Sequence, residues 1–272
     1  MAVKRIGDVE LRYTLEGEGP LTVLLHGFGG SPGDWRLVAE GLHADGRILI
    51  INIKSLFSHQ SPLSFTHQVN LLSEFILGFV EETESLRLVG SSYGATLTFG
   101  IQSLLGDRVS HQVLINPMPL DPLKELRHPL LRWLFFIYRL PTGMFTFALT
   151  PIGRRYFEAL GRLFHMGLGT QKKIRRFNHR KWRLIRHAIH RFLWIARTED
   201  WEAWKAKAPV VRPSCWVIFG SQDFLFTEET YRRTAIFFGS DQLVPVPGGG
   251  HELILSRPKL ISETLTKLWG KA

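Results

Sequence analysis

The sequence predicts an α/β fold in which a mostly parallel sheet is covered by helices on both faces. Short runs rich in β-branched and apolar residues alternate with stretches of helical periodicity, which is the pattern of such a sheet. Hydrophobic residues make up 44% of the chain and charged residues 21%. This balance is typical of a folded globular protein and excludes a disordered or collagen-like chain.

Six runs are predicted to form the buried strands of the sheet, and a hairpin is predicted before them. Apolar and polar residues alternate from Asp8 to Leu15, which indicates an antiparallel edge hairpin that ends near Gly17. The last helix is expected near Pro258–Trp269, packed over the sheet. The six buried strands are Leu21–Leu25, Ile48–Ile53, Leu86–Val89, Gln112–Ile115, Trp216–Phe219 and Leu243–Val246.

A helical insertion is predicted between the fourth and fifth of these strands, because the intervening residues show helical periodicity and no convincing strand. We therefore assign residues 1–117 and 209–272 to the core and residues 118–208 to the insertion. From Asp121 to Lys207 there are 19 Lys or Arg against 6 Asp or Glu, a net charge of +13, whereas the whole chain carries +10. The positive charge is concentrated in the insertion.

A nucleophile motif follows the strand Leu86–Val89. The run Gly90-Ser91-Ser92-Tyr93-Gly94 separates this strand from a helix-like stretch that starts at Ala95. Such a turn is so tight that the positions two before and two after the serine can hardly carry a Cβ atom, and it pushes the Ser92 hydroxyl into the open. The five residues alone also fit a glycine-rich turn without a chemical role. Whether Ser92 is a nucleophile therefore depends on the other motifs.

A second loop offers backbone donors for an oxyanion. The run His26-Gly27-Phe28-Gly29-Gly30 directly follows the strand Leu21–Leu25. Acyl transfer needs two preorganised N–H donors, and this loop and the residue after the nucleophile are the places that supply them. The predicted donors are the amides of Phe28 and Tyr93. His26 is assigned a structural hydrogen-bonding role, because it lies at the strand end within the loop itself.

A carboxylate and an imidazole follow two later strands. The strand Trp216–Phe219 runs into Gly220-Ser221-Gln222-Asp223, and Leu243–Val246 runs into a glycine-rich turn that ends in His251-Glu252. A single loop Asp or His is more typical of plain surface. Here four motifs each follow a strand: the oxyanion loop and the motifs that contain Ser92, Asp223 and His251. The last three stand in the chain order Ser, acid, His, which is the order of this fold. The sequence therefore predicts a triad of Ser92, Asp223 and His251.

Together these motifs resemble the α/β-hydrolase superfamily. HGFGG, GSSYG, GSQD and GGGHE match, position by position, the motifs that supply its oxyanion hole, nucleophile, acid and base. The resemblance covers Asp8–Pro117 and Val211–Trp269. It implies an open sheet of about eight strands with a helical cap inserted after the sixth. The basic insertion fits that cap.

Two places depart from the superfamily pattern. After the strand that ends near Ile53, relatives commonly have an Asp and a glycine-rich stretch ending in Ser, whereas the run from Asn52 to Pro62 has no glycine. This leaves the subfamily open. Some relatives also place the acid after the sixth strand, where Asn116 and then Asp121 stand. We prefer Asp223, because it directly follows its strand with the matching spacing.

The predicted function is a serine hydrolase that cleaves a carboxylic ester through an acyl-enzyme, with an apolar acyl group and no cofactor or metal. Dehalogenases and epoxide hydrolases of this fold resemble it but use Asp in the nucleophile position. Two alternatives stay open. One is a thioesterase or ester hydrolase for acyl groups linked to a carrier protein or CoA, and the other is a noncatalytic binding protein that kept the fold. Substrate-binding residues are not predicted.

The basic insertion suggests two kinds of partner beside a plain solvated surface. Between Gln171 and Arg191, nine Lys or Arg and no acid accompany apolar residues at helical spacing, which predicts a basic amphipathic helix. The plain interpretation is a solvated face. The alternatives are docking of an acidic carrier protein or its acyl group, and attraction to an anionic membrane surface. Nucleic acid is not favoured, because nothing resembles a base-reading motif.

The predicted location is the cytoplasm, with peripheral attachment to a membrane as the alternative. The single Cys215 excludes an intramolecular disulfide and fits a reducing compartment. The first residues contain no apolar leader run. The most apolar stretch, Leu130–Leu149, is interrupted by Arg132 and Arg139, so it is not expected to span a membrane.

The choice of acid is testable by substitution. Asp223→Asn is expected to lower the turnover of an ester substrate by orders of magnitude, because the histidine base loses the group that orients it and stabilises its charge. Asp121→Asn should leave turnover nearly unchanged. Steady-state kinetics of the two purified variants would measure this, and the opposite ranking would move the acid to Asp121.

Overall fold

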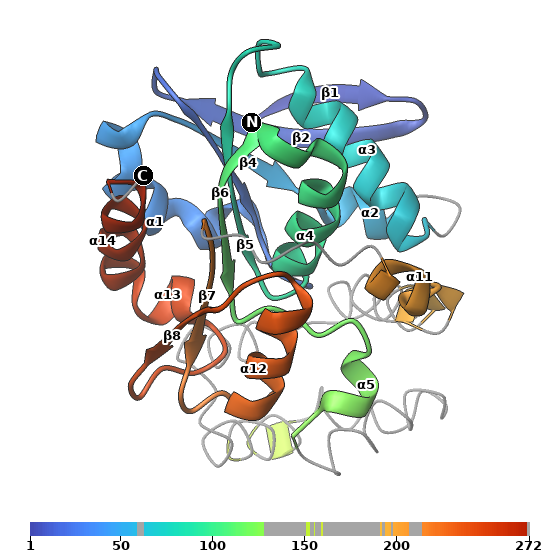
Figure 1. Cartoon of the computed structure of the whole chain (residues 1–272), viewed down its shortest axis with the longest axis vertical. Helices are drawn as coiled ribbons and strands as arrows, with labels where there is room; N and C mark the ends of the chain where they lie inside the picture. Colours follow the sequence, from blue (N-terminus) through green and yellow to red (C-terminus); the bar gives the residue numbers. More distant parts are fainter. Residues whose placement is uncertain are drawn as a thin grey trace.

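The computed structural model describes residues 1–58, 63–127, 194–196, 198–206 and 214–270, together with residues 151, 152, 155, 159 and 191. In this part of the chain, one eight-stranded sheet lies between two layers of helices (Figure 1). The strand order is β1-β2-β4-β3-β5-β6-β7-β8. The predicted α/β class with a mostly parallel, two-sided sheet is confirmed.

The sheet is antiparallel at one edge and parallel elsewhere. Strand β2 pairs antiparallel with both β1 and β4, and each of the other neighbouring pairs is parallel. The strands are β1 (Ala2–Ile6), β2 (Val9–Glu16), β3 (Leu21–Leu25), β4 (Arg47–Asn52), β5 (Leu86–Ser91), β6 (Val109–Ile115), β7 (Cys215–Gly220) and β8 (Gln242–Val246).

All six predicted strands are present, but β8 is an edge strand and mostly half-buried or exposed, because only β7 pairs with it. The predicted hairpin is displaced. The alternating run from Asp8 to Leu15 forms only the second strand of the hairpin, and β1 precedes it. The turn between them is made by Gly7, whose φ of 56° is the left-handed conformation that glycine adopts without strain. The edge strand β1 carries Lys4 and Arg5 and buries little, so its hydrophobic pattern is weak.

Helices bury both faces of the sheet. One layer contains α1 (Arg36–Leu42), α13 (Leu253–Ser256) and α14 (Pro258–Trp269), and the other contains α2 (Lys54–Ser58), α3 (Phe65–Leu77), α4 (Tyr93–Leu105) and α12 (Glu228–Phe237). Successive strand residues point to opposite layers. Leu24 packs with the α1 and α14 layer, and Leu25 packs with the other. This explains why a central strand such as β3 carries apolar residues on both of its faces.

The insertion leaves the core after β6 and returns before β7. The short helices α5 (Pro122–Glu125) and α11 (Trp201–Ala206) lie at its two ends. The Glu199 carboxylate accepts hydrogen bonds from the backbone amides of Phe65, at 2.9 Å, and Thr66, at 3.2 Å. It thereby caps the first turn of α3 and attaches the returning segment to the core.

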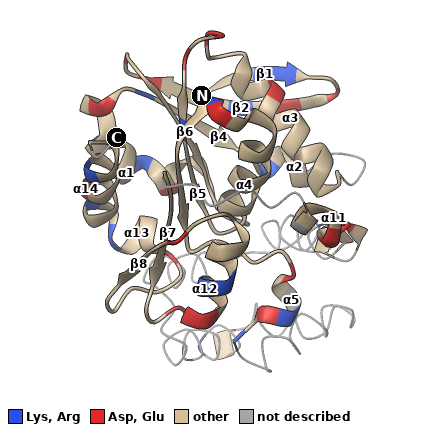
Figure 2. Ribbon diagram, viewed as in Figure 1, with Lys and Arg blue, Asp and Glu red and all other residues tan. Residues whose placement is uncertain are grey.

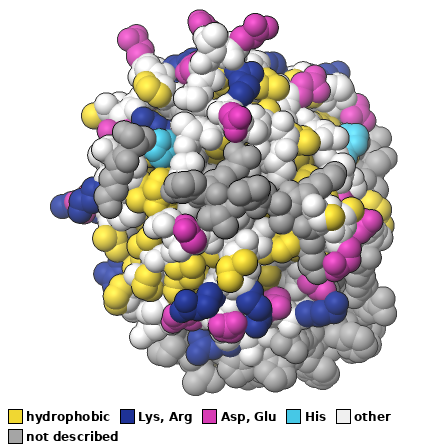
Figure 3. All heavy atoms as spheres, viewed as in Figure 1, with side chains coloured by type: hydrophobic (Ala, Val, Ile, Leu, Met, Phe, Trp, Pro, Cys, Tyr) yellow, Lys and Arg dark blue, Asp and Glu magenta, His cyan; other side chains and the backbone are white. Residues whose placement is uncertain are grey.

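Most of residues 118–208 lies outside the described residues, so the domain boundaries and the helical cap stay predictions. The same holds for the basic amphipathic helix predicted over residues 171–191 and for its acidic or membrane partners. In the described elements, basic and acidic side chains are interspersed, as on α12 (Figure 2). Apolar side chains lie between the charged ones on the face that α12 and β8 form (Figure 3). None of the described helices has the length and apolarity that crossing a membrane requires.

Candidate active site

Ser92 occupies a sharp turn between β5 and α4. Its backbone has φ 54° and ψ −120°, a conformation that non-glycine residues rarely adopt. The end of the neighbouring strand β6 holds this conformation. The Ser92 amide donates to the Ile115 carbonyl at 2.9 Å, and the Met118 amide donates to the Ser92 carbonyl at 3.3 Å. The turn places Ser92 at the carboxyl edge of the parallel strands, where the chain emerges from the sheet.

The two glycines of this turn are required by close backbone contacts. A Cβ atom on Gly90 would lie 2.5 Å from both the amide nitrogen and the Cα atom of Ala95. A Cβ atom on Gly94 would collide with the Leu25 carbonyl oxygen and lie 2.6 Å from that of His26. These contacts are with backbone, so a side-chain rotation cannot relieve them. The predicted reason for the G-x-S-x-G spacing is therefore present in the structure.

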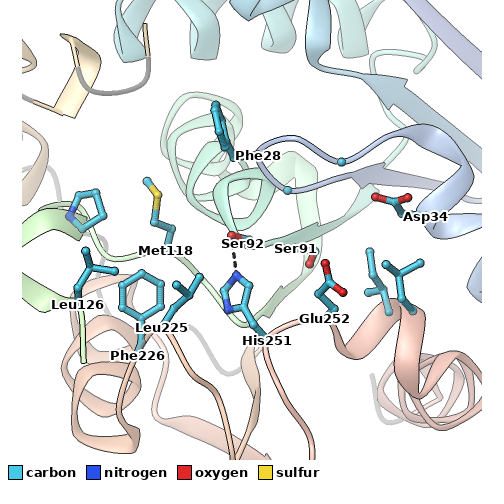
Figure 4. A pocket seen from close by; sticks show the side chains of 15 residues that line it. Phe28, Asp34, Ser91, Ser92, Met118, Leu126, Leu225, Phe226, His251 and Glu252 are labelled. Atoms are coloured by element: carbon cyan, nitrogen blue, oxygen red, sulfur yellow. Dashed lines mark hydrogen bonds between the residues drawn. The ribbon is translucent and has the colours of Figure 1, made fainter. Parts of the chain in front are cut away.

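The structure brings Ser92, His251 and Asp223 into one hydrogen-bonded line. The Oγ atom of Ser92 lies 3.0 Å from Nε2 of His251, and Nδ1 of the same ring lies 2.6 Å from Oδ2 of Asp223 (Figure 4 shows the first contact). The three residues follow β5, β8 and β7, which end at the same edge of the sheet. Residues 28 to 159 positions apart in the chain thus meet at one point.

The loops that carry Asp223 and His251 are packed against each other. The Gln222 amide donates to the Gly249 carbonyl at 2.8 Å. A Cβ atom on Gly220 would collide with the carbonyl oxygens of Gly249 and Gly250, so the end of β7 lies directly against the glycine-rich turn. This contact explains the glycine at position 220, because a side chain there would push the turn before His251 away from the loop that carries the acid.

Asp223 is buried and surrounded by donors that sequence reasoning did not assign to the site. Its Oδ1 atom accepts from the Leu225 amide at 2.6 Å, and its Oδ2 atom accepts from Nδ2 of Asn116 at 2.6 Å and from the Tyr231 hydroxyl. Asn116 could have been found, because it directly follows β6, where some relatives have the acid. Tyr231 had no comparable signal, because it lies inside helix α12.

Asp121, the alternative acid, lies elsewhere. It precedes helix α5, and its carboxylate forms an ion pair with Lys124 at 2.8 Å. The carboxylate that contacts His251 is that of Asp223. His26 is also separate from this line of residues. Its Nδ1 atom donates to the Gly27 carbonyl at 2.9 Å, and its Nε2 atom accepts from the Ile53 amide at 3.2 Å, as its expected structural role requires.

The two residues predicted as oxyanion donors are joined by a third aromatic side chain. Tyr93 is the first residue of α4, and the first amides of a helix point out of its N-terminus. The Phe57 ring lies 5.2 Å from the Phe28 ring and 5.3 Å from the Tyr93 ring, centroid to centroid. Phe57 belongs to helix α2. This helix is formed by the run after β4 that departs from the superfamily pattern. The role of Phe28 and Tyr93 as donors stays a prediction.

Asp223 and His251 shift each other's pKa values in the direction that favours their charged forms. Burial alone would lower the pKa of His251, but the adjacent Asp223 carboxylate outweighs burial and raises this pKa above its usual 6.5. Burial would conversely raise the pKa of Asp223, but His251 and the hydrogen-bond donors on the carboxylate lower it. Asp223 is therefore ionised at neutral pH, and it favours the protonated form of His251.

A cavity opens beside Ser92 and His251, and its two sides differ in chemistry (Figure 4). On one side lie the apolar side chains of Met118, Leu126, Leu225 and Phe226. On the other side lie the carboxylates of Asp34 and Glu252. Ile254 and Leu255, which closely follow Glu252 in the chain, also line the cavity, so this side is not purely polar. Ser92 stands between the two sides, so a bound molecule would place one part on either side of the hydroxyl. In the described part of the chain, no three His, Cys, Asp or Glu side chains are grouped to hold a metal.

Comparison with known proteins agrees with the motifs. The model of a family described as "Alpha/beta hydrolase family" matches residues 22–264. Among curated proteins, 1-acylglycerol-3-phosphate O-acyltransferase ABHD5 of Mus musculus is 28% identical over 138 residues. That match covers 48% of this chain and 39% of the mouse protein, so the chain spans about two fifths of this relative's length.

Solved structures share the fold over nearly the whole chain. A thermophilic esterase from Thermogutta terrifontis superposes with a TM-score of 0.67 at 17% identity, covering 97% of this chain and 94% of the esterase. The carboxylesterase CesB from Bacillus subtilis superposes with a TM-score of 0.65 at 15% identity, covering 100% of this chain and 91% of that one. At these identities the likeness concerns the fold.

The tight turn at Ser92 can be tested through stability. Gly94→Ala is expected to lower the free energy of unfolding by roughly 1–3 kcal/mol, because the new methyl group is forced into backbone carbonyls. Gly33→Ala is the matched control, since its Cβ atom would meet only Ser31 Oγ, at 3.7 Å. Thermal unfolding of both variants would measure the difference. Equal melting temperatures would contradict the close packing of this turn.

The raised pKa of His251 predicts a pH dependence. His251 must be neutral to accept a proton from Ser92, so kcat/KM for a neutral ester should rise with pH, with a midpoint above 6.5. In Asp223→Asn the carboxylate no longer favours the imidazolium, so burial, opposed only by the weaker effect of Glu252, should move the midpoint to lower pH than in the parent. Residual activity measured from pH 4 to 9 would show this shift. An unmoved midpoint in the variant would contradict the assigned pairing, and Asp121→Asn should keep the parent midpoint.

Proposed function

Because the chain belongs to the alpha/beta hydrolase family, we propose that it hydrolyses carboxylic esters through an acyl-enzyme at Ser92. The observation that carries this proposal is the line of hydrogen bonds that begins at Ser92, beside a partly apolar cavity, and runs through His251 to the buried Asp223. A hydroxyl, an imidazole and a buried carboxylate in this arrangement are the groups that nucleophilic acyl transfer needs.

In the first step, Ser92 Oγ attacks the acyl carbon of the ester. The Nε2 atom of His251, 3.0 Å from Oγ, takes the hydroxyl proton. The resulting imidazolium is stabilised by the ionised Asp223, whose Oδ2 atom lies 2.6 Å from Nδ1. His251 then gives its proton to the departing alcohol oxygen, which leaves an acyl group bonded to Ser92.

Negative charge develops on the acyl oxygen during the attack. We assign its stabilisation to the backbone amides of Phe28 and Tyr93, because they come from the two loops that flank Ser92. The contacts of the Phe57 ring with both side chains would help to keep the two amides at a constant separation. In the second step, a water molecule activated by His251 attacks the acyl-enzyme and releases the acid.

The cavity supports an apolar acyl group. Met118, Leu126, Leu225 and Phe226 would remove the acyl chain from water, a contribution that grows with buried apolar area. The side that carries Asp34 and Glu252 would face the alcohol half of the ester. The esterase and carboxylesterase that share the fold are consistent with this reaction class.

A fluorophosphonate probe tests the proposed nucleophile. We expect the probe to label Ser92 covalently, because the hydroxyl is activated by His251. Ser92→Ala should abolish the labelling while the variant keeps the parent melting temperature, which shows that it still folds. Absence of labelling in the folded parent would favour the noncatalytic alternative.

A substrate panel distinguishes the proposed ester hydrolase from a thioesterase. The panel contains p-nitrophenyl esters of increasing acyl length, acyl-CoA and acyl-carrier protein, each measured beside Ser92→Ala. We expect kcat/KM to be highest for the esters and to increase with acyl length. A preference for acyl-CoA or the acyl-carrier protein would replace the proposal by a thioesterase.

A further inference from the structure

We propose that Asn116 and Tyr231 are positioning residues that act through Asp223 and set the pH at which His251 becomes an active base. This inference rests on the function proposed above and extends it to two side chains outside the triad. Neither touches Ser92. Both donate to the oxygen of Asp223 that also contacts His251.

Three donors converge on a single carboxylate oxygen. Oδ2 of Asp223 accepts from Nδ1 of His251 at 2.6 Å, from Nδ2 of Asn116 at 2.6 Å and from the Tyr231 hydroxyl. Asn116 Nδ2 also lies 3.2 Å from the Tyr231 oxygen. Asn116, Tyr231 and Asp223 therefore form a closed triangle of hydrogen bonds. The three side chains are buried, and a buried polar network stabilises its members only when they are hydrogen-bonded.

The backbone at Asn116 is arranged for this contact. Asn116 has φ 46°, in the left-handed region, where asparagine is among the few tolerated non-glycine residues. Its amide donates to the Ile218 carbonyl at 2.8 Å, which attaches it to β7, the strand that Asp223 closely follows. Within the described residues its side-chain oxygen is buried without a hydrogen-bond partner. The opposite orientation of this amide would set that oxygen against the carboxylate of Asp223. The left-handed backbone and the unpaired oxygen are therefore both consequences of placing Nδ2 against Asp223.

Tyr231 acts as a donor throughout the working pH range. Burial and the neighbouring Asp223 raise the pKa of its hydroxyl well above 10, so the hydroxyl keeps its proton. Its ring is held between two phenylalanine rings, with centroids 5.1 Å from Phe219 and 6.2 Å from Phe226. The hydroxyl is therefore directed at Asp223 by packing and not by the hydrogen bond alone.

These donors have two consequences for His251. They orient the carboxylate, and they place positive ends of dipoles beside the oxygen that faces the imidazole. Those dipoles offset part of the negative potential that Asp223 exerts on His251, so they limit how strongly the imidazolium is favoured. His251 then becomes a neutral base at a lower pH than it would beside a bare carboxylate.

Other charged groups face the pair from the neighbouring elements. Glu252 follows His251 and also favours the imidazolium. Arg127, from the start of the insertion, donates to the Asp223 backbone carbonyl at 2.8 Å. Asp34 lies on the far side of the cavity. None of these groups is altered by removing the Tyr231 hydroxyl, so a shift in that variant reports on the network itself.

The test is the pH dependence of fluorophosphonate labelling in Tyr231→Phe, which needs no knowledge of the substrate. We expect the midpoint of the labelling rate to move to higher pH than in the parent, because one offsetting dipole is lost. Below the midpoint, labelling should slow by about tenfold, the effect of roughly one hydrogen bond to a charged group. The matched control is Tyr13→Phe on β2, which four strands separate from β7, and it should label like the parent.

A second variant keeps the proposal testable if Tyr231→Phe does not fold. Asn116→Gly keeps the left-handed backbone without strain. It removes the side-chain amide, which donates to Asp223 and lies 3.3 Å from the Gly250 carbonyl, so its midpoint should move in the same direction. An unmoved midpoint, or a shift to lower pH, in a folded variant would overturn the role of the network and leave the triad intact. Absence of labelling in the parent would instead overturn the proposed function and this inference together.

Discussion

The site depends on one constraint, the close approach of backbone around the turn at Ser92. The chain must pass from β5 into α4 without a spacer, so Ser92 takes a left-handed conformation, and the positions two before and two after it must be glycine. The carbonyls of Leu25 and Ile115, at the ends of the two adjacent strands, define the space that remains. The position of the hydroxyl is thus a property of the sheet and not of a flexible loop, which suits a group that must be held for reaction.

The parallel sheet then brings the acid, the base and Asn116 to the same edge as Ser92. Strands β5, β6, β7 and β8 are neighbours, and each ends at the same edge. The loops after them carry Ser92, Asn116, Asp223 and His251 in that order, so residues far apart in the sequence need only short loops to meet. The acid is the most deeply buried of the ionised groups there. Its charge is tolerated because every contact described around it comes from a donor.

After β4, where the sequence departs from the superfamily pattern, a short helix takes the place of the expected glycine-rich stretch. The run after β4 lacks the expected glycines and forms α2 instead. Its Phe57 fills the space between the rings of Phe28 and Tyr93, beside the predicted oxyanion donors. Asn52, at the end of β4, accepts from the Lys54 amide at 3.1 Å and so begins this turn. The departure changes the support of the site while leaving the proposed reacting groups in place.

The sequence by itself determined the fold class, the six central strands and the identity of the three aligned residues, because apolar runs and tight glycine turns are local signals. It could not decide between Asp223 and Asp121 by more than spacing, since a carboxylate acts through the neighbours that folding gives it. Only the tertiary structure joined Asp223 to His251 and revealed Asn116 and Tyr231, which lie 107 positions before it and 8 after it in the chain. Hydrogen bonds between strands and across layers have no periodicity in sequence. For that reason the three aligned residues could be predicted, whereas in the network that supports the acid only Asn116 left a signal in the sequence, through its place after β6.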